Sequence, residues 1–198
     1  IIYDKNSNTW EEFDLASTGL DVETVTFLGI GGNDLWFGLD EGLALYNRET
    51  EVLSAFDSTD TDILNYPLDN IAFTDKNVWF TQSYDDEENN MFVYTGLIRY
   101  NKATSTWSVI NTTNSDILYE GISSLSAQNN ELWIAYYEYF EEEFFINEDP
   151  QPGGGGGQPE FMQYGISKYD EDKDLFSHYN STDSGLTEDT VNKIIAKE

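Results

Sequence analysis

The sequence contains no cysteine, a single histidine and few basic residues. Without cysteine the chain cannot form disulfides, use a thiolate nucleophile or bind zinc through sulfur. Lys and Arg together number nine, against 38 Asp and Glu, for a formal net charge of −29. A surface of this charge repels phosphate groups, so the composition argues against binding of nucleic acid and against insertion into anionic membranes.

Long apolar runs are also missing, so the sequence predicts no transmembrane helix. No secretory signal is visible, and the first residue is Ile rather than Met, so we expect a mature product or an excerpt of something longer. Hydrophobic residues make up 39% of the chain and aromatic residues 15%, which is enough to build a core. The acidity fits a highly soluble extracellular surface, adaptation to high salt, or a calcium-rich setting.

An internal repeat is the strongest pattern in the sequence. Trp36, Trp79 and Trp133 each lie in a short apolar run, "LWFG", "VWFT" and "LWIA". Downstream of each Trp, a Gly stands four residues before a Tyr, and a polar turn and another apolar run follow. These Gly and Tyr positions are Gly42 with Tyr46, Gly96 with Tyr100, and Gly165 with Tyr169. Tyr3, in the opening "IIYDKNSNTWEEFD", is a fourth copy of the Tyr.

Each repeat holds four short runs separated by turn residues, and Trp36 and Trp79 are 43 residues apart. Four strands per unit of about this length are typical of a β-propeller blade. The sequence therefore predicts an all-β fold, a β-propeller of four-stranded antiparallel blades. We expect residues 1–198 to be one partial propeller with these parts: outer strands at 1–14, whole blades at 22–57, 68–111 and 120–180, and the inner strand of a next blade at 189–197. Such an arc belongs to a larger ring, or completes its ring by pairing with another chain.

The stretch "LWFGLDEGLALYNRETEVLSAFDSTD…LDNIAFTDKNVWFT" resembles the two-component-regulator propeller repeat. The resemblance covers nearly the whole chain and is weaker in the third repeat, where Ala135 replaces the Gly after the Trp. It implies a periplasmic or extracellular, cell-surface propeller, often the sensor part of a membrane histidine kinase and often tied to glycan sensing. We interpret the repeated Trp and Tyr side chains as packing between neighbouring blades rather than as ligand sites.

The repeats differ in length between their second and third strands. Relative to the first repeat, the second carries an insertion at 83–95 and the third a longer one at 136–164. Both insertions mix aromatic and acidic residues, and we expect 136–147 with 159–164 to form an extended hairpin. Long loops on a rigid scaffold often carry function. The candidate binding or assembly residues are Tyr84, Tyr94, Tyr136, Tyr137, Tyr139, Phe140, Phe144 and Phe145. The alternative is a solvated loop whose aromatic side chains fold back on their own blade.

Two further kinds of site have weaker signals. Carboxylates at Asp85, Asp86, Glu87 and Glu88 are hard oxygen ligands suited to calcium, but no alternating Asp loop is present, so we expect no metal or other cofactor. The sequons at Asn111 and Asn180 are candidate glycosylation sites, although Asn, Ser and Thr also build turns.

The function predicted from these features is recognition rather than catalysis. The lone His178 falls on an expected outermost strand, and no nucleophile, metal-protease or phosphate-loop motif is present, so we expect no enzyme activity. The first hypothesis is an extracellular sensor or binding module that uses the inserted loops to hold a glycan or a protein ligand. The second is a structural subunit of a surface layer, sheath or filament, in which the same loops contact copies of the chain. The third is an inert spacer domain.

Overall fold

The fold is given by a computed structural model, and its residues divide into two compact units. The first unit comprises Ile1–Phe73 and Asn77–Val109, and the second comprises Thr74–Lys76 and Ile110–Glu198. The structure describes residues 2–5, 7–12, 14–20, 22–40, 42–59, 66–89, 91–137, 139–140, 161–162 and 165–197.

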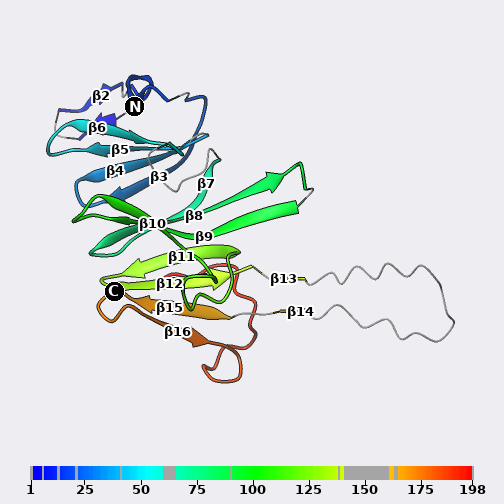
Figure 1. The fold of residues 1–198 in the computed structure, drawn as a ribbon. Helices are drawn as coiled ribbons and strands as arrows, with labels where there is room; N and C mark the ends of the chain where they lie inside the picture. Colours follow the sequence, from blue (N-terminus) through cyan, green and yellow to red (C-terminus); the bar gives the residue numbers. More distant parts are fainter. Residues whose placement is uncertain are drawn as a thin grey trace, which may run out of the picture. The chain divides into compact units, whose positions relative to one another are not determined.

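The described residues form an all-β structure with three four-stranded antiparallel sheets (Figure 1). In each sheet the strands that follow one another in the sequence are neighbours. The first unit holds β3 (Val25–Gly31), β4 (Asp34–Leu39), β5 (Leu43–Asn47) and β6 (Val52–Phe56), then β7 (Leu68–Phe73), β8 (Asn77–Asp86), β9 (Met91–Asn101) and β10 (Thr106–Ile110). The second unit holds β11 (Ile122–Gln128), β12 (Glu131–Tyr136), β15 (Ile166–Asp170) and β16 (Leu175–Tyr179).

Three smaller elements accompany the sheets. The strands β1 (Ile2–Asp4) and β2 (Thr9–Glu11) pair with each other, as do β13 (Tyr139–Phe140) and β14 (Phe161–Met162). A short 3-10 turn, η1, spans Ala16–Thr18. No helix among the described residues is long and apolar enough to cross a membrane.

The strand pairing confirms the predicted repeat at the level of single residues. Each repeated Trp lies on the second strand of its sheet, opposite a small residue of the first strand: Gly29 for Trp36, Ala72 for Trp79 and Ser126 for Trp133. Each first strand also has a register shift at the same place, between Val25 and Phe27, between Leu68 and Asn70, and between Ile122 and Ser124. A shared bulge and a shared register indicate one structural unit used three times.

The turn before the last strand of each sheet repeats as well. Five residues after each repeated Tyr, a residue other than glycine adopts a positive φ: 56° at Glu51, 53° at Ser105 and 51° at Asp174. The same turn joins β1 to β2, where Asn8 has a φ of 56° and its Oδ1 accepts a hydrogen bond from the Tyr3 hydroxyl at 2.6 Å. The pair β1–β2 therefore has the geometry of the last two strands of a four-stranded sheet, as the position of Tyr3 in the sequence predicts.

The core of the first unit lies between its two four-stranded sheets. Trp36 is fully buried there, with Leu43 from its own sheet and Val78, Phe80 and Ile98 from the other sheet. The close approach of the sheets depends on small residues of β3, since a Cβ added at Gly29 or Gly31 would come within 3 Å of a ring or methyl carbon of β7. Burial of these large side chains supplies most of the stabilisation that such a unit can draw on.

The second unit has a single four-stranded sheet, and residues 189–197, predicted as the inner strand of a next blade, lie beside it. These residues do not join a strand ladder. Instead, the backbone N–H groups of Ile194 and Ala196 donate to the hydroxyls of Ser124 and Ser126 on β11, at 3.3 and 2.8 Å. The segment therefore lies against β11, and its role as the inner strand of a next blade stays a prediction.

Glycine at position 42 is required by both conformation and space. Gly42 has a φ of +89°, and a Cβ there would lie 2.4 Å from the carbonyl oxygen of Phe56. Gly32 also has a positive φ, +63°, but a Cβ there would meet nothing within 4 Å. We expect Gly32→Ala to cost about 1–2 kcal/mol from the left-handed backbone alone. Gly42→Ala should cost more, toward the upper end of roughly 1–3 kcal/mol, because the Phe56 backbone must also move.

Urea unfolding of the two variants, followed by tryptophan fluorescence, measures this difference. The matched pair separates the steric contribution from the backbone conformation that both glycines share. Equal losses of unfolding free energy in the two variants would contradict the close approach at Gly42.

Candidate functional site

The insertion at 83–95 forms a regular hairpin, the outer part of β8 and β9, which extends past the other strands of its sheet (Figure 1). We call residues 83–94 the β8–β9 arm. A register shift between Thr81 and Ser83 separates the arm from the sheet. Beyond this shift the two strands pair with each other down to Asp86 opposite Met91. At the base of the arm, Ser83 Oγ donates to Asp69 Oδ2 of β7 at 2.7 Å.

The tip of the arm is closed by Asp86. Its Oδ1 accepts hydrogen bonds from the backbone N–H groups of Glu88 and Asn89, at 3.1 and 3.2 Å, and its Oδ2 accepts one from Asn89 Nδ2 at 2.8 Å. Hydrogen bonds from Asn89 hold the pKa of the Asp86 carboxyl below its usual value. Asp86 is therefore a turn-forming residue.

The two faces of the arm each carry an aromatic pair. Residues opposite each other in an antiparallel ladder share a face, so Tyr84 lies with Val93 on one side, and Phe92 lies with Asp85 on the other. On the first side the Tyr84 ring stacks on Tyr66, with centroids 4.5 Å apart and planes at 10°. On the second side Phe92 and Tyr94 meet edge to face at 5.1 Å.

Tyr66 is the residue that sequence reasoning missed. It stands directly before Pro67, outside both insertions, and its side chain is 41% exposed. Buried Gln82 of β8 fixes its position, because Gln82 Nε2 donates to the Tyr66 carbonyl oxygen. The Gln82 carbonyl in turn accepts from Thr95 Oγ1 at 2.9 Å. The signal available in the sequence was the Tyr-Pro pair itself, since a residue before proline is held extended.

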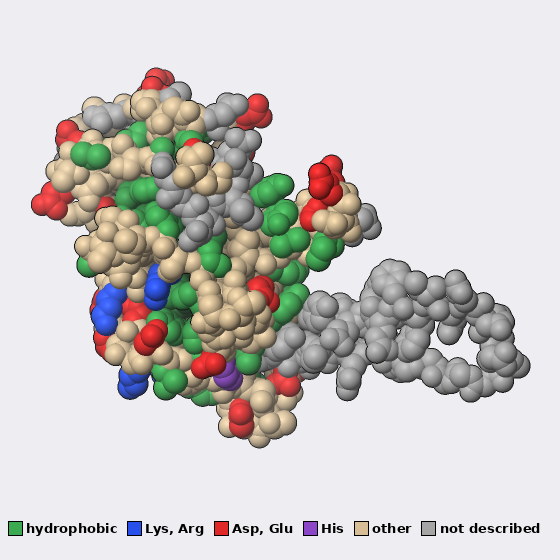
Figure 2. Space-filling model, viewed as in Figure 1, with side chains coloured by type: hydrophobic (Ala, Val, Ile, Leu, Met, Phe, Trp, Pro, Cys, Tyr) green, Lys and Arg blue, Asp and Glu red, His purple; other side chains and the backbone are tan. Residues whose placement is uncertain are grey.

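The surface of the arm combines apolar and acidic groups. Met91 and Phe92 are more than half exposed, and Asp85, Glu87 and Glu88 are exposed as well. Residues 83–95 include no Lys or Arg. Figure 2 shows hydrophobic side chains along the arm and acidic ones at its tip. Among the described arm residues, Phe92 is the one exposed aromatic side chain, and Tyr84 and Tyr94 are half-buried. Exposed apolar side chains on a regular, supported hairpin are typical of contact surfaces.

The residues predicted in the longer insertion separate into three groups. Tyr136 is buried at the end of β12, whereas the neighbouring Tyr137 is 44% exposed. Tyr139 and Phe140 form β13 and pair with Met162 and Phe161, which agrees with the hairpin expected there. Phe144 and Phe145 lie outside the described residues, as does the rest of the predicted hairpin up to Phe161.

Tyr136 belongs to a buried polar chain. Its hydroxyl donates to Ser167 Oγ at 2.8 Å, and Ser167 Oγ lies 2.8 Å from His178 Nδ1. Burial raises the pKa of Tyr136 to about 12. Ser167 is fully buried whereas His178 is exposed, and their hydrogen bond satisfies the buried serine hydroxyl.

The two sequon asparagines occupy equivalent turns. Asn111 Oδ1 accepts from the backbone N–H of Thr113 at 3.0 Å, and Asn180 Oδ1 accepts from the backbone N–H of Thr182 at 2.9 Å. Both asparagines therefore stabilise a turn through their Oδ1 atoms. Glycosylation would use the side-chain amide nitrogen instead, and it stays a prediction. Within the described residues, no group of three or more His, Asp or Glu side chains is arranged to hold a metal ion.

Comparison with known proteins gives structural neighbours only. No protein-family model and no curated protein matches the chain. Solved structures that it resembles include two of the extracellular domain of BT4673 from B. thetaiotaomicron, assigned provisionally to a one-component system in one and to a hybrid two-component system in the other. Identities are 18% and 19%, with TM-scores of 0.40 and 0.43.

Each match covers 90% of this chain and 26% of the solved chain, so the chain spans about a quarter of their length. Both neighbours are extracellular domains, the location that the sequence analysis expects for this chain. Membership of the propeller-repeat family stays a prediction, because no family model matches.

The hydrogen-bonded His178 predicts a pH-dependent stability. Burial lowers the pKa of His178 below 6.5, and the nearby Asp116 opposes this to a smaller extent. As the pH falls below 6.5, the unfolded chain binds the proton before the folded chain does, so unfolding becomes easier until the folded pKa is reached. Above pH 6.5 the histidine is neutral in both states, so it does not make the free energy of unfolding depend on pH.

Denaturant unfolding of the wild type and of His178→Gln, compared across pH 6.5, isolates this contribution from the many carboxylates. We expect the free-energy difference between the two proteins to be constant above that pH and to move in favour of the variant below it. A difference that stays flat throughout would show that His178 titrates equally in both states.

Proposed function

We propose that the chain is part of a non-catalytic extracellular or periplasmic recognition module, a propeller of four-stranded blades that binds a glycan or protein ligand through the β8–β9 arm. The exposed aromatic surface of the arm carries this proposal. Tyr84 of the arm stacks on Tyr66, and Phe92 meets Tyr94 edge to face, on a hairpin with defined register. Flat apolar rings next to carboxylates suit a ligand with apolar faces and hydrogen-bond donors.

The support of the arm favours binding over a solvated loop. Gln82 is buried at its base and hydrogen-bonded to Tyr66, and Asp86 closes its tip with three hydrogen bonds. A hairpin organised in this way loses little conformational entropy when a ligand binds, which favours affinity. Catalysis has no comparable support, since the Ser167 hydroxyl beside His178 is fully buried.

Removal of single rings from the arm tests the proposal. A panel of soluble neutral and acidic polysaccharides serves as the probe, with binding measured by the retardation of the native protein in gels that contain each polymer. We expect Tyr84→Ser and Phe92→Ser each to weaken binding by at least about tenfold, as for aromatic residues at the centre of an interface. Val52→Ser, which removes another exposed apolar side chain of the same unit, should bind as the wild type does.

A protein ligand is tested in the same way, with extracellular protein from the source culture passed over immobilised wild type, Phe92→Ser and Val52→Ser. The proposal that the arm binds a protein ligand is supported if the wild type and Val52→Ser retain a protein that Phe92→Ser does not. If all variants bind polysaccharide or protein equally well, the arm is not the ligand-binding surface.

A further inference from the structure

Of the three four-stranded sheets, the one formed by β11, β12, β15 and β16 has a serine and a histidine at positions where the other two sheets have apolar residues. The shared register makes Tyr136, Ser167 and His178 equivalent to positions of every sheet. In that order, these positions hold Leu39, Ala44 and Ala55 in the first sheet, and Gln82, Ile98 and Val109 in the second. The packing of the repeat therefore does not require Ser167 and His178.

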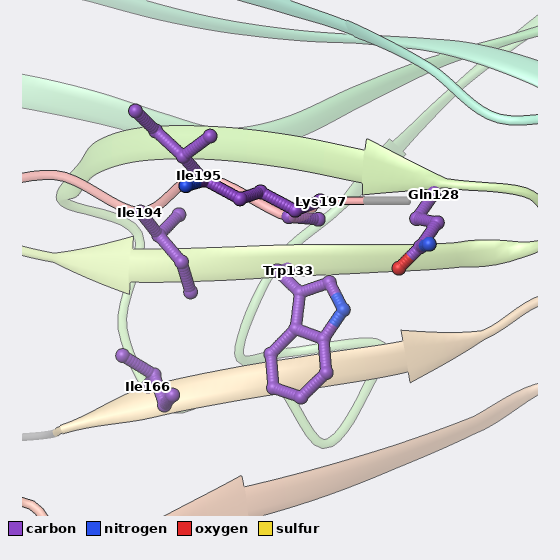
Figure 3. Close-up of a pocket in the computed structure, with 7 residues that line it drawn as sticks. Gln128, Trp133, Ile166, Ile194, Ile195 and Lys197 are labelled. Carbon is purple, nitrogen blue, oxygen red and sulfur yellow. The ribbon is translucent and has the colours of Figure 1, made fainter.

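These three residues lie on the face of their sheet that is turned away from Trp133. Trp133 of β12 and Ile166 of β15 line a groove on one face (Figure 3). Side chains alternate between the two faces along a strand, so Tyr136 and Ser167 lie on the other face. His178 stands opposite Ser167 in the ladder. Tyr136 and Ser167 are buried, whereas His178 is exposed to solvent.

Hydrogen bonds join these groups into a chain. The Tyr136 hydroxyl donates to Ser167 Oγ, which lies 2.8 Å from His178 Nδ1. Two further hydrogen bonds join the ring of His178 to the Asp116 backbone and the Tyr136 oxygen to the Leu118 backbone. The first favours the protonated ring, as a carbonyl acceptor does, and the second favours the phenolate, as an N–H donor does. We therefore assign the ring hydrogen to Nε2, and the Ser167 hydrogen to the bond with Nδ1.

The chain of hydrogen bonds holds the connection between β10 and β11 on the sheet. Asp116 and Leu118 belong to this connection, and Ile117 between them is buried. The connection also supports the start of the longer insertion, because the Tyr137 backbone N–H donates to the Gly121 carbonyl oxygen at 2.9 Å. The exposed imidazole is thus linked, through two buried hydroxyls, to the segment that supports Tyr137.

Protonation of His178 is incompatible with this arrangement. A proton from solvent turns Nδ1 into a donor, so Ser167 can no longer donate to it. If Ser167 Oγ accepts from Nδ1 instead, the buried Ser167 hydrogen loses its acceptor. If Ser167 donates to the Tyr136 oxygen, the Tyr136 hydrogen loses its acceptor. A buried hydroxyl without an acceptor is costly, so the protonated ring favours a structure in which the connection has left the sheet.

We propose that the Tyr136–Ser167–His178 chain is a pH-sensitive latch. When His178 is neutral, the latch is closed and holds residues 116–121 on the sheet. When His178 is protonated, the hydrogen bonds break and release residues 116–121 together with the start of the longer insertion at Tyr137. The latch goes beyond the proposed ligand-binding function and uses no residue of the β8–β9 arm, so the two proposals are independent.

The titratable groups around His178 set the pH at which the latch opens. Burial lowers the pKa of His178 below 6.5, and this is the largest effect. Asp116, on the connection, opposes it with its carboxylate and its backbone. Tyr136, on β12, has a pKa of about 12 and stays neutral throughout. The latch therefore opens below pH 6.5, and the charge of Asp116 influences how far below.

The state of the latch is measurable by NMR, because the sequence has a single histidine and all imidazole signals come from His178. Above pH 6.5 we expect the nitrogen shifts of the Nε2–H tautomer, and we expect a protonation midpoint below 6.5. Hydrogen exchange of the whole chain gives the protection factors of the Leu118 and Tyr137 amides over the same range. Both should fall by at least about fivefold as His178 is protonated, as expected for the loss of buried hydrogen bonds.

Three variants separate the histidine from the many carboxylates. His178→Gln stays neutral, so both protection factors should stay constant across this range. Asp116→Asn removes a charge that favours the protonated ring, so the midpoint and the loss of protection should both move to lower pH. Asp85→Asn, on the arm, changes the net charge by the same amount and should leave both at the wild-type pH. If His178→Gln does not fold, Asp116→Asn supplies the test.

Four results would overturn the proposal. Protection factors that do not change across the His178 midpoint would show that no latch opens. A loss of protection that persists in His178→Gln would assign it to carboxylates. An Nδ1–H tautomer at neutral pH would reverse the assigned direction of the chain. A midpoint in Asp116→Asn equal to that of the wild type would place the Asp116 carboxylate away from the ring.

Discussion

The packing of a large aromatic side chain between successive sheets is the interaction on which the rest of this structure depends. Trp36 reaches full burial only because the neighbouring sheet supplies Phe80, Tyr100 and Trp107 around it. Close approach of the two backbones requires Gly29 and Gly31 on the strand in between. A single sheet of this kind has no way to bury its Trp alone, so stability comes from stacking one sheet on the next.

The sequence predicted the parts of the fold that depend on local chemistry. The spacing of the repeated Trp and Tyr residues predicted where in the sequence the three four-stranded sheets lie. The position of Tyr3 predicted that β1–β2 matches the last two strands of such a sheet. The Gly before each Tyr adopts a positive φ, 89° at Gly42, 81° at Gly96 and 70° at Gly165, as a turn into the third strand requires. The inner strand expected at 189–197 stays a prediction, because a strand is defined by its pairing partner and no described strand pairs with this segment.

The candidate site was predictable in position but not in composition. Insertion length located the β8–β9 arm, and alternation along a ladder explains why its aromatic residues divide between two faces. Tyr66 was not predicted because it is distant from Tyr84 in the sequence. The two rings stack only in the folded structure, where Gln82 holds the Tyr66 backbone. Tyr136 was grouped with the exposed aromatic residues because it begins an aromatic run, yet it is the last buried position of β12 and bonds to Ser167. Burial at a strand end is set by neighbouring strands rather than by the run itself.

The register shift at the base of the arm has a consequence for how this surface can change. Because the ladder restarts at Ser83 opposite Tyr94, the outer hairpin is uncoupled from the pairing of the sheet below it. Adding or removing two residues on each strand would alter its reach, keep each side chain on its face and leave the Trp79 level untouched. A change on one strand alone would carry its side chains to the opposite faces. The bulge thus allows the surface of the arm to diversify while the sheet below it stays constant.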